Sequence, residues 1–158
     1  MFNAGLISVV LLVLCTLIHY EMLSGVKTLL GKITIIPRRA KLLVVIFGTM
    51  FSHFFQIALF ASAYFLLRDK FGLGLFGGDF QDVFSSFLYF SIETYTSLGF
   101  GDIYPIGGIR MLAGVEALTG LVMIGWTASF TYLEMNQYWT DVNMSAPYGT
   151  KKRRPDGL

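Results

Sequence analysis

Three long runs of apolar residues, separated by more polar segments, dominate the pattern of this 158-residue chain. They span Gly5–Met22, Leu42–Leu67 and Met111–Leu133. Because about twenty helical residues cross the hydrocarbon core of a bilayer, each run is long enough to form one membrane-spanning helix. A fourth stretch, Val83–Thr96, is aromatic and compatible with a helix but too short and too polar to cross. The pattern therefore predicts three transmembrane helices and one re-entrant helix.

Composition supports a membrane location for these runs. Hydrophobic residues make up 54% of the chain and charged residues 14%, with a mean hydropathy of +0.63. A soluble domain carries roughly a quarter charged residues, so this chain lacks the polar surface that would cover a soluble globule. Cys15 is the single cysteine, which excludes an intrachain disulfide and any cysteine-based zinc site. Basic and aromatic residues are not interleaved in this chain, so it lacks the pattern that would indicate nucleic acid binding.

The distribution of basic residues predicts the orientation in the membrane. The N-terminal run has no Lys or Arg ahead of it, unlike a signal peptide, so we interpret residues 1–24 as a retained helix. Segment 25–41 is basic and contains no acid, which places it in the cytoplasm. Three crossings then leave the N-terminus outside and the C-terminus inside. The tail 140–158 agrees with this orientation, because it carries a basic cluster formed by Lys151, Lys152, Arg153 and Arg154. This cluster either attracts anionic lipid headgroups or only fixes the topology.

The most distinctive motif follows the short helix and reads Thr96-Ser97-Leu98-Gly99-Phe100-Gly101-Asp102. Successive carbonyls can point inward only where some residues adopt backbone angles open chiefly to glycine, a need that Gly99 and Gly101 meet. A ring of such carbonyls can replace the water shell of a potassium ion. The motif resembles the signature of the pore-loop potassium channel family, Thr-Val-Gly-Tyr-Gly-Asp after a pore helix. The resemblance extends over residues 80–132.

This resemblance implies an all-α membrane protein that assembles as a homotetramer, because each chain supplies one filter loop and the ion needs four. The chain resembles the bacterial two-helix pore type with an extra N-terminal helix, so the expected location is a bacterial inner membrane. It implies no enzymatic activity and no cofactor other than the conducted ion. The expected parts are an N-terminal helix (1–24), a basic loop (25–41), a pore domain (42–139) and the tail (140–158). Within the pore domain, the resemblance predicts an outer helix at 42–67, a pore helix at 83–96, a filter at 97–101 and an inner helix at 110–133.

The family resemblance also assigns roles to residues of the motif and of the helix before it. Potassium would bind at Ser97, Leu98, Gly99 and Phe100, with Gly101 completing the filter. Four residues would support the filter from behind: Tyr89, Glu93, Thr96 and Asp102. Among them, Glu93 and Asp102 would share a proton, because two adjacent carboxyls do not both ionise readily. The alternative for Glu93 is a side chain that extends to solvent.

Two departures from the family signature keep a second function open. Serine stands where the family has threonine, and Leu-Gly-Phe replaces Val-Gly-Tyr, so a phenol that could hydrogen-bond behind the filter is missing. The alternative is therefore a non-selective monovalent cation channel. A non-conducting accessory subunit is a third possibility. A small membrane enzyme that uses its carboxylates is disfavoured, because the chain has no nucleophile or metal motif to accompany them.

The third apolar run contains residues that need an explanation. Gly120 and Gly125 are either gating hinges or, for Gly120, a point of close helix packing. Glu116 is a carboxylate within a membrane helix, which is energetically costly and usually functional or paired. We favour a bond from Glu116 to the back of the short helix through Thr94 or Ser91, over a position facing the cavity.

Polar residues also lie within the first two runs. His19 ends the first, and one helical face of the second carries Thr49, Ser52, His53 and Gln56. The two histidines could form a proton or metal sensor. Interhelical hydrogen bonding is the favoured interpretation, because the histidines show no metal-ligand spacing. No helix carries arginine at every third position, so no conventional voltage sensor is expected.

Overall fold

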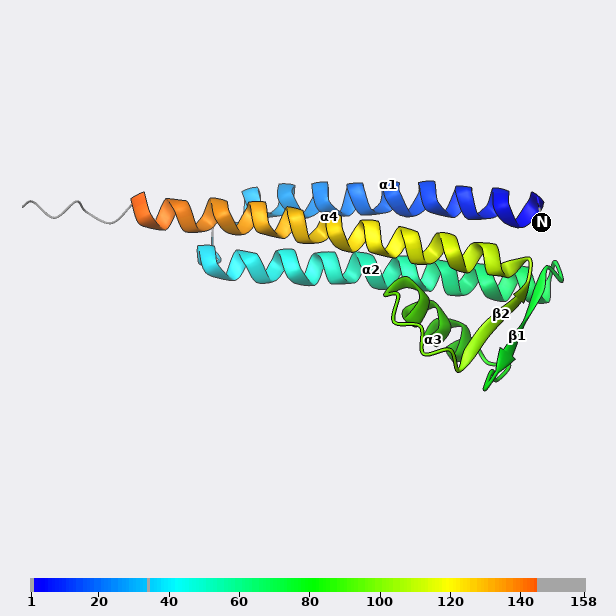
Figure 1. The fold of residues 1–158 in the computed structure, drawn as a ribbon. Coiled ribbons are helices and arrows are strands. Elements are labelled where there is room, and N and C mark those ends of the chain that lie inside the picture. Colours follow the sequence, from blue (N-terminus) through cyan, green and yellow to red (C-terminus); the bar gives the residue numbers. More distant parts are fainter. Residues whose placement is uncertain (1, 34, 145–158) are drawn as a thin grey trace, which may run out of the picture.

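The computed structural model describes residues 2–33 and 35–144, in which three long helices run side by side (Figure 1). Each contains a segment long and apolar enough to cross a membrane, namely Ala4–Lys32, Ala40–Asp69 and Ile109–Gln137. The predicted fold class, three spanning helices with a short helix between the second and third, is confirmed. The elements in chain order are α1 (Phe2–Lys32), α2 (Arg38–Asp69), β1 (Gly74–Gly78), α3 (Phe84–Tyr95), β2 (Ile103–Gly107) and α4 (Ile109–Met144).

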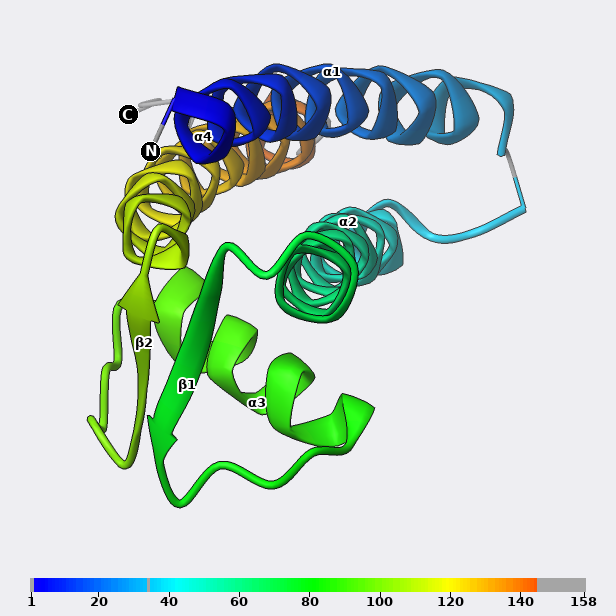
Figure 2. The same ribbon diagram turned by 90° about the vertical axis from the view of Figure 1, so that its right-hand side faces the viewer.

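The short helix and the two strands lie at one end of the bundle, the end at which α1 begins (Figure 1). In the end-on view, α1 lies across α2 and α4 on one side, while α3 and the strands lie on the other (Figure 2). Both α1 and α3 therefore pack against the same pair of helices, α2 and α4, from opposite sides.

The first helix is longer than the apolar pattern indicated. It continues to Lys32, and α2 already begins at Arg38, so most of the segment expected to be a basic loop is helical. Val26 and Leu30 are buried and pack with Val45 of α2, which extends the apolar contact beyond the hydrophobic run. The ammonium group of Lys41 donates a hydrogen bond to the Leu30 carbonyl at 2.9 Å. This bond satisfies a carbonyl in the last turn of α1, where cations are favoured.

The last helix also exceeds its predicted end at residue 133, because apolarity and helicity are different properties. Residues 134–144 contain neither Pro nor Gly, so nothing in the local sequence interrupts the helix. By contrast, α3 lies within one residue of the predicted 83–96 at each end. The basic cluster 151–154 lies outside the described residues.

The glycine-rich segment before α3 forms a strand. Strands β1 and β2 pair antiparallel, with Gly74 opposite Gly107 and Gly78 opposite Ile103. A Cβ at Gly78, where φ is +81°, would lie 1.9 Å from the Asp102 carbonyl oxygen. Glycine here permits a backbone conformation and an approach that a side chain would prevent. The resulting two-stranded ribbon ties the chain before α3 to the chain that follows Asp102.

Candidate ion pathway

Aromatic side chains anchor the outer part of α3. Phe76 of β1 lies at the centre of the cluster, and its ring centroid is 5.0 to 5.7 Å from those of four neighbours: Tyr64, Phe80, Phe87 and Phe90. Most of these pairs meet edge to face, the geometry that aromatic quadrupoles favour. The cluster packs α2, the ribbon and α3 against one another.

An ion pair adds a polar contact at the edge of this cluster. The Arg68 guanidinium lies over the Phe80 ring, 5.0 Å from its centroid, and donates two hydrogen bonds to the Asp82 carboxylate. The hydrogen bonds and charge of Arg68 hold the pKa of Asp82 below its ordinary value. This bidentate pair links the end of α2 to the segment that enters α3.

The loop after α3 has an unusual backbone. Ser97, Gly99 and Gly101 have φ values of +59°, +57° and +79°. Since Ser97 alone among the described non-glycine residues has a positive φ, the sign of φ alternates residue by residue from Ser97 to Gly101. Such alternation turns successive N–H groups toward one side of the chain and the carbonyl oxygens toward the other.

Hydrogen bonds show which side the N–H groups face. Those of Leu98 and Gly99 donate to the Glu93 carbonyl at 2.8 and 3.3 Å, and that of Phe100 donates to the Glu93 carboxyl at 3.3 Å. The N–H groups therefore point back to α3, leaving the carbonyl oxygens free on the opposite side. The whole loop is exposed in the single chain, including the side chains of Leu98 (58%) and Phe100 (66%). One chain alone leaves these two large side chains without a packing partner.

The residues expected behind the loop do gather there. The Tyr89 hydroxyl donates to Asp102 Oδ2 at 2.9 Å, while Asp102 Oδ1 accepts the Ile103 N–H at 3.1 Å. Glu93 is buried rather than extended to solvent. Burial, and secondly the neighbouring Asp102 carboxylate, raise the pKa of Glu93 above its ordinary value. Thr96 instead caps its own helix, since its hydroxyl donates to the Ile92 carbonyl at 2.8 Å.

Glu93 should make stability depend on pH in a defined direction. Because its pKa is higher in the folded than in the unfolded chain, the folded chain binds more protons above the ordinary value of 4.5. Its contribution to stability is therefore fully present below pH 4.5 and is lost as pH rises through the raised pKa. We expect Glu93→Gln to remove this part of the pH dependence of the thermal midpoint. Glu21→Gln, at an exposed carboxyl of α1, is the control, and parallel profiles for wild type and Glu93→Gln would contradict the assignment.

Glu116 of α4 is fully buried and binds both neighbouring elements. Its Oε2 accepts the Tyr64 hydroxyl of α2 at 2.5 Å, and its Oε1 lies 2.5 Å from the Ser91 hydroxyl of α3. Of the two expected partners, Ser91 rather than Thr94 makes the contact. The single Ser91 proton also has the Ile57 carbonyl as an acceptor at 2.9 Å. A protonated Glu116 satisfies every group, because Glu116 then donates to Ser91 and Ser91 donates to Ile57.

The two glycines of α4 considered as hinges differ in their surroundings. A Cβ on Gly120 would lie 1.9 Å from the Tyr95 carbonyl oxygen, whereas one on Gly125 would have no heavy atom within 4 Å. Gly120 is therefore the point at which α4 passes directly over the last residue of α3. Gly125 makes no such contact.

The two histidines come together between the helices. Their ring centroids are 5.3 Å apart, and each ring bonds to other helices. His19 of α1 bonds to Ser52 and Gln56 of α2 and to Thr127 of α4, while His53 of α2 bonds to Thr127 and to Tyr95 of α3. Among the described residues, no group of three His, Cys, Asp or Glu side chains could hold a metal ion.

Sequence inspection missed three partners in these clusters. Tyr64 lies within the apolar run 42–67 and was not singled out there. It is the one tyrosine of that run, and the intramembrane carboxylate of Glu116 needs a hydrogen-bond donor. Tyr95 and Thr127 belong to segments that otherwise suggested only aromatic packing or a spanning helix. A search for a donor to match each intramembrane acceptor would have indicated Tyr64.

The fold and this site define an integral membrane protein in which a short helix presents a loop of unpaired carbonyls. The family model described as "Ion channel" matches residues 40–134, which comprise nearly all of α2, the ribbon, α3, the loop and most of α4. The chain belongs to this ion channel family and is not an enzyme. Comparison with curated proteins and with solved structures gave no match.

Proposed function

We propose that the chain is one subunit of a homotetrameric potassium channel and that Ser97–Gly101 form its selectivity filter. The alternation of φ along this loop carries the proposal, because it leaves a row of carbonyl oxygens free on one side. Such oxygens can replace the hydration shell of a potassium ion. The oxygens of Ser97, Leu98, Gly99 and Phe100 would hold the ion.

Two observations support a tetramer. One chain supplies a single row of carbonyls, whereas an ion needs oxygens around its full circumference. The exposed side chains of Leu98 and Phe100 are large and apolar, and they flank this row. Large exposed apolar side chains often mark a protein–protein interface. Identical copies arranged around a closed symmetry axis would bury them. A fourfold arrangement accounts for both.

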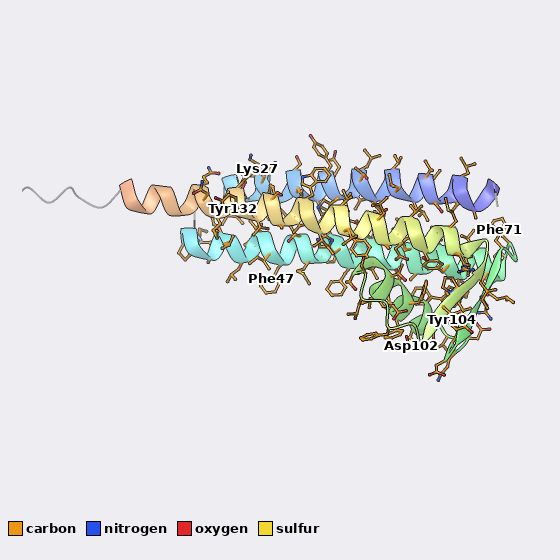
Figure 3. The ribbon with its side chains drawn as sticks, in the orientation of Figure 1. Lys27, Phe47, Phe71, Asp102, Tyr104 and Tyr132 are labelled. Atoms are coloured by element: carbon orange, nitrogen blue, oxygen red, sulfur yellow. The ribbon has the colours of Figure 1, made fainter. Side chains whose placement is uncertain are left out.

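The charge distribution supports the proposed orientation. Lys27 lies toward the end of the bundle opposite Asp102 and Tyr104 (Figure 3), and Lys32 and Lys41 follow in the same region of the chain. The positive-inside bias makes that end cytoplasmic, in keeping with a bacterial inner membrane. The N-terminus and the filter entrance would then lie outside. The C-terminal basic cluster would lie at the cytoplasmic surface, where anionic lipids would attract it.

A non-selective cation channel is the second candidate. Ser97 lacks the methyl group of threonine, and Phe100 lacks a hydroxyl that could fix its ring. Both losses remove restraints from the loop, and a looser ring discriminates less between ions of different size.

Reconstitution into liposomes tests the proposal. Purified protein should carry potassium flux that barium blocks, and its reversal potential with potassium on one side and sodium on the other should favour potassium. Equal permeability to both ions would support the non-selective candidate. Absence of flux from correctly assembled particles would favour an accessory subunit and contradict both channel proposals.

A further inference from the structure

A closed ring of hydrogen bonds joins all four helices beside the end of α3. Its bonds are Gln56 Nε2 to His19 Nδ1 (3.1 Å), His19 Nε2 to Thr127 (3.2 Å), Thr127 to His53 Nε2 (2.9 Å), His53 Nδ1 to Tyr95 (3.0 Å) and Tyr95 to Gln56 Oε1 (2.9 Å). One member comes from α1, two from α2, one from α3 and one from α4. Among the described residues, no buried side-chain polar atom is left without a partner.

The direction of each bond follows from the two ends of Gln56. Tyr95 donates its proton to Gln56 Oε1, so its oxygen accepts from His53 Nδ1–H. The other nitrogen of a neutral His53 then accepts from the Thr127 hydroxyl, and Thr127 accepts from His19 Nε2–H. His19 Nδ1 finally accepts from the Gln56 amide. Each member donates once and accepts once around the ring, and both histidines are neutral with opposite tautomers.

A ring of this kind behaves as a unit. Hydrogen bonds that point the same way around a chain polarise one another, so each strengthens its neighbours. Reversing one bond requires reversing all. Removing the Tyr95 hydroxyl or Thr127 leaves a donor and an acceptor unpaired in a membrane interior. Removing His19 leaves Thr127 without the donor from which it accepts, whereas Gln56 Nε2 keeps its bond to the Ser52 hydroxyl at 3.1 Å. His19 and Gln56 are fully buried and Tyr95 nearly so, where water does not readily replace a lost partner.

One member of the ring, Tyr95, lies next to the loop that we propose as the filter. Tyr95 is the last residue of α3 and lies two residues before Ser97. Its hydroxyl is held by the ring from α2, while its backbone carbonyl lies against Gly120 of α4. The ring therefore fixes the side chain of Tyr95 at the point from which the loop departs.

We propose that His19 of α1 is a positioning residue for ion conduction, because it closes the ring that holds Tyr95 in place. The inference rests on the proposed function of Ser97–Gly101 as the filter. It assigns a role to a helix that lies outside the matched region 40–134. Movement of α1 would open the ring at His19 and weaken the two bonds from α2 that hold the Tyr95 hydroxyl, so α1 contributes to ion conduction.

Single-channel recording of the full-length tetramer tests this role with matched variants. His19→Leu removes the ring member on α1, and Tyr95→Phe removes only the hydroxyl on α3. Cys15→Ala is the control, because Cys15 is also fully buried on α1 one turn earlier but lies in the apolar cluster. We expect His19→Leu and Tyr95→Phe to lower open probability by similar factors of about threefold or more, the size expected for interhelical bonds in membranes. Cys15→Ala should match wild type.

An open probability of His19→Leu equal to that of Cys15→Ala would overturn the proposal. If His19→Leu does not assemble, Thr127→Val replaces it, since this near-isosteric change removes both ring bonds of Thr127. Thr127→Val with wild-type open probability would equally overturn the proposal. Open probability is measured with potassium and with sodium as charge carrier. A wild-type channel that does not prefer potassium would contradict the proposed selectivity, yet the effect of the ring would still be measurable.

Discussion

Replacement of Gly99 by alanine is expected to lower potassium flux by at least about a hundredfold while the chain still folds. Gly99 has a φ of +57°, and a Cβ there would meet no heavy atom within 4 Å. The cost is therefore conformational, roughly 1–2 kcal/mol for an L-residue in the left-handed region. In the proposed tetramer, four copies of the substitution would raise the free energy of the conducting conformation by about 4–8 kcal/mol. Each 1.4 kcal/mol lowers the population of that conformation by about a factor of ten.

Barium-sensitive flux into liposomes measures this effect, with size-exclusion elution as the test of assembly. Gly25→Ala is the matched control, because Gly25 lies within α1, has no atom within 4 Å of a Cβ position and does not have a positive φ. Alanine favours a helix by about 1 kcal/mol over glycine, so this control should assemble and conduct normally. Wild-type flux through Gly99→Ala would show that the loop does not use its left-handed backbone for conduction.

Replacement of Gly120 by alanine is expected to separate α4 from the end of α3. The new Cβ would lie 1.9 Å from the Tyr95 carbonyl oxygen and 2.8 Å from its carbon. Both atoms belong to backbone, so no side-chain rotation relieves the overlap and a helix must shift. Overpacking of this kind costs about 1–3 kcal/mol per site, and we expect a lower thermal midpoint together with loss of flux.

Gly125→Ala distinguishes close packing from a hinge. Gly125 has open space around it, so alanine there should leave the thermal midpoint unchanged or raise it. If Gly120 serves only as a hinge, Gly120→Ala would keep the wild-type thermal midpoint and change only the open probability. Unchanged stability of Gly120→Ala would therefore contradict the packing assignment.

The bounds of the helices show where prediction from the sequence ended. Apolar runs located the spanning segments, because a bilayer core imposes a minimum length of apolar helix. They underestimated α1 and α4, whose last turns are polar or contact a neighbour through only a few residues, such as Val26 and Leu30. The ribbon was missed because a glycine-rich strand has no apolar alternation, and the pairing of Gly74 with Gly107 depends on residues more than thirty positions away.

The sequence by itself determined that the chain is a membrane protein and that Thr96–Asp102 is its most specialised segment. It did so because apolar length and glycine spacing are local properties, which one stretch of chain displays in full. Only the tertiary structure decided the partners of Glu116, the contact of Gly120 with Tyr95 and the ring that joins His19 to Tyr95. A hydrogen bond between helices depends on their relative rotation and depth, and those are fixed by packing over the whole bundle.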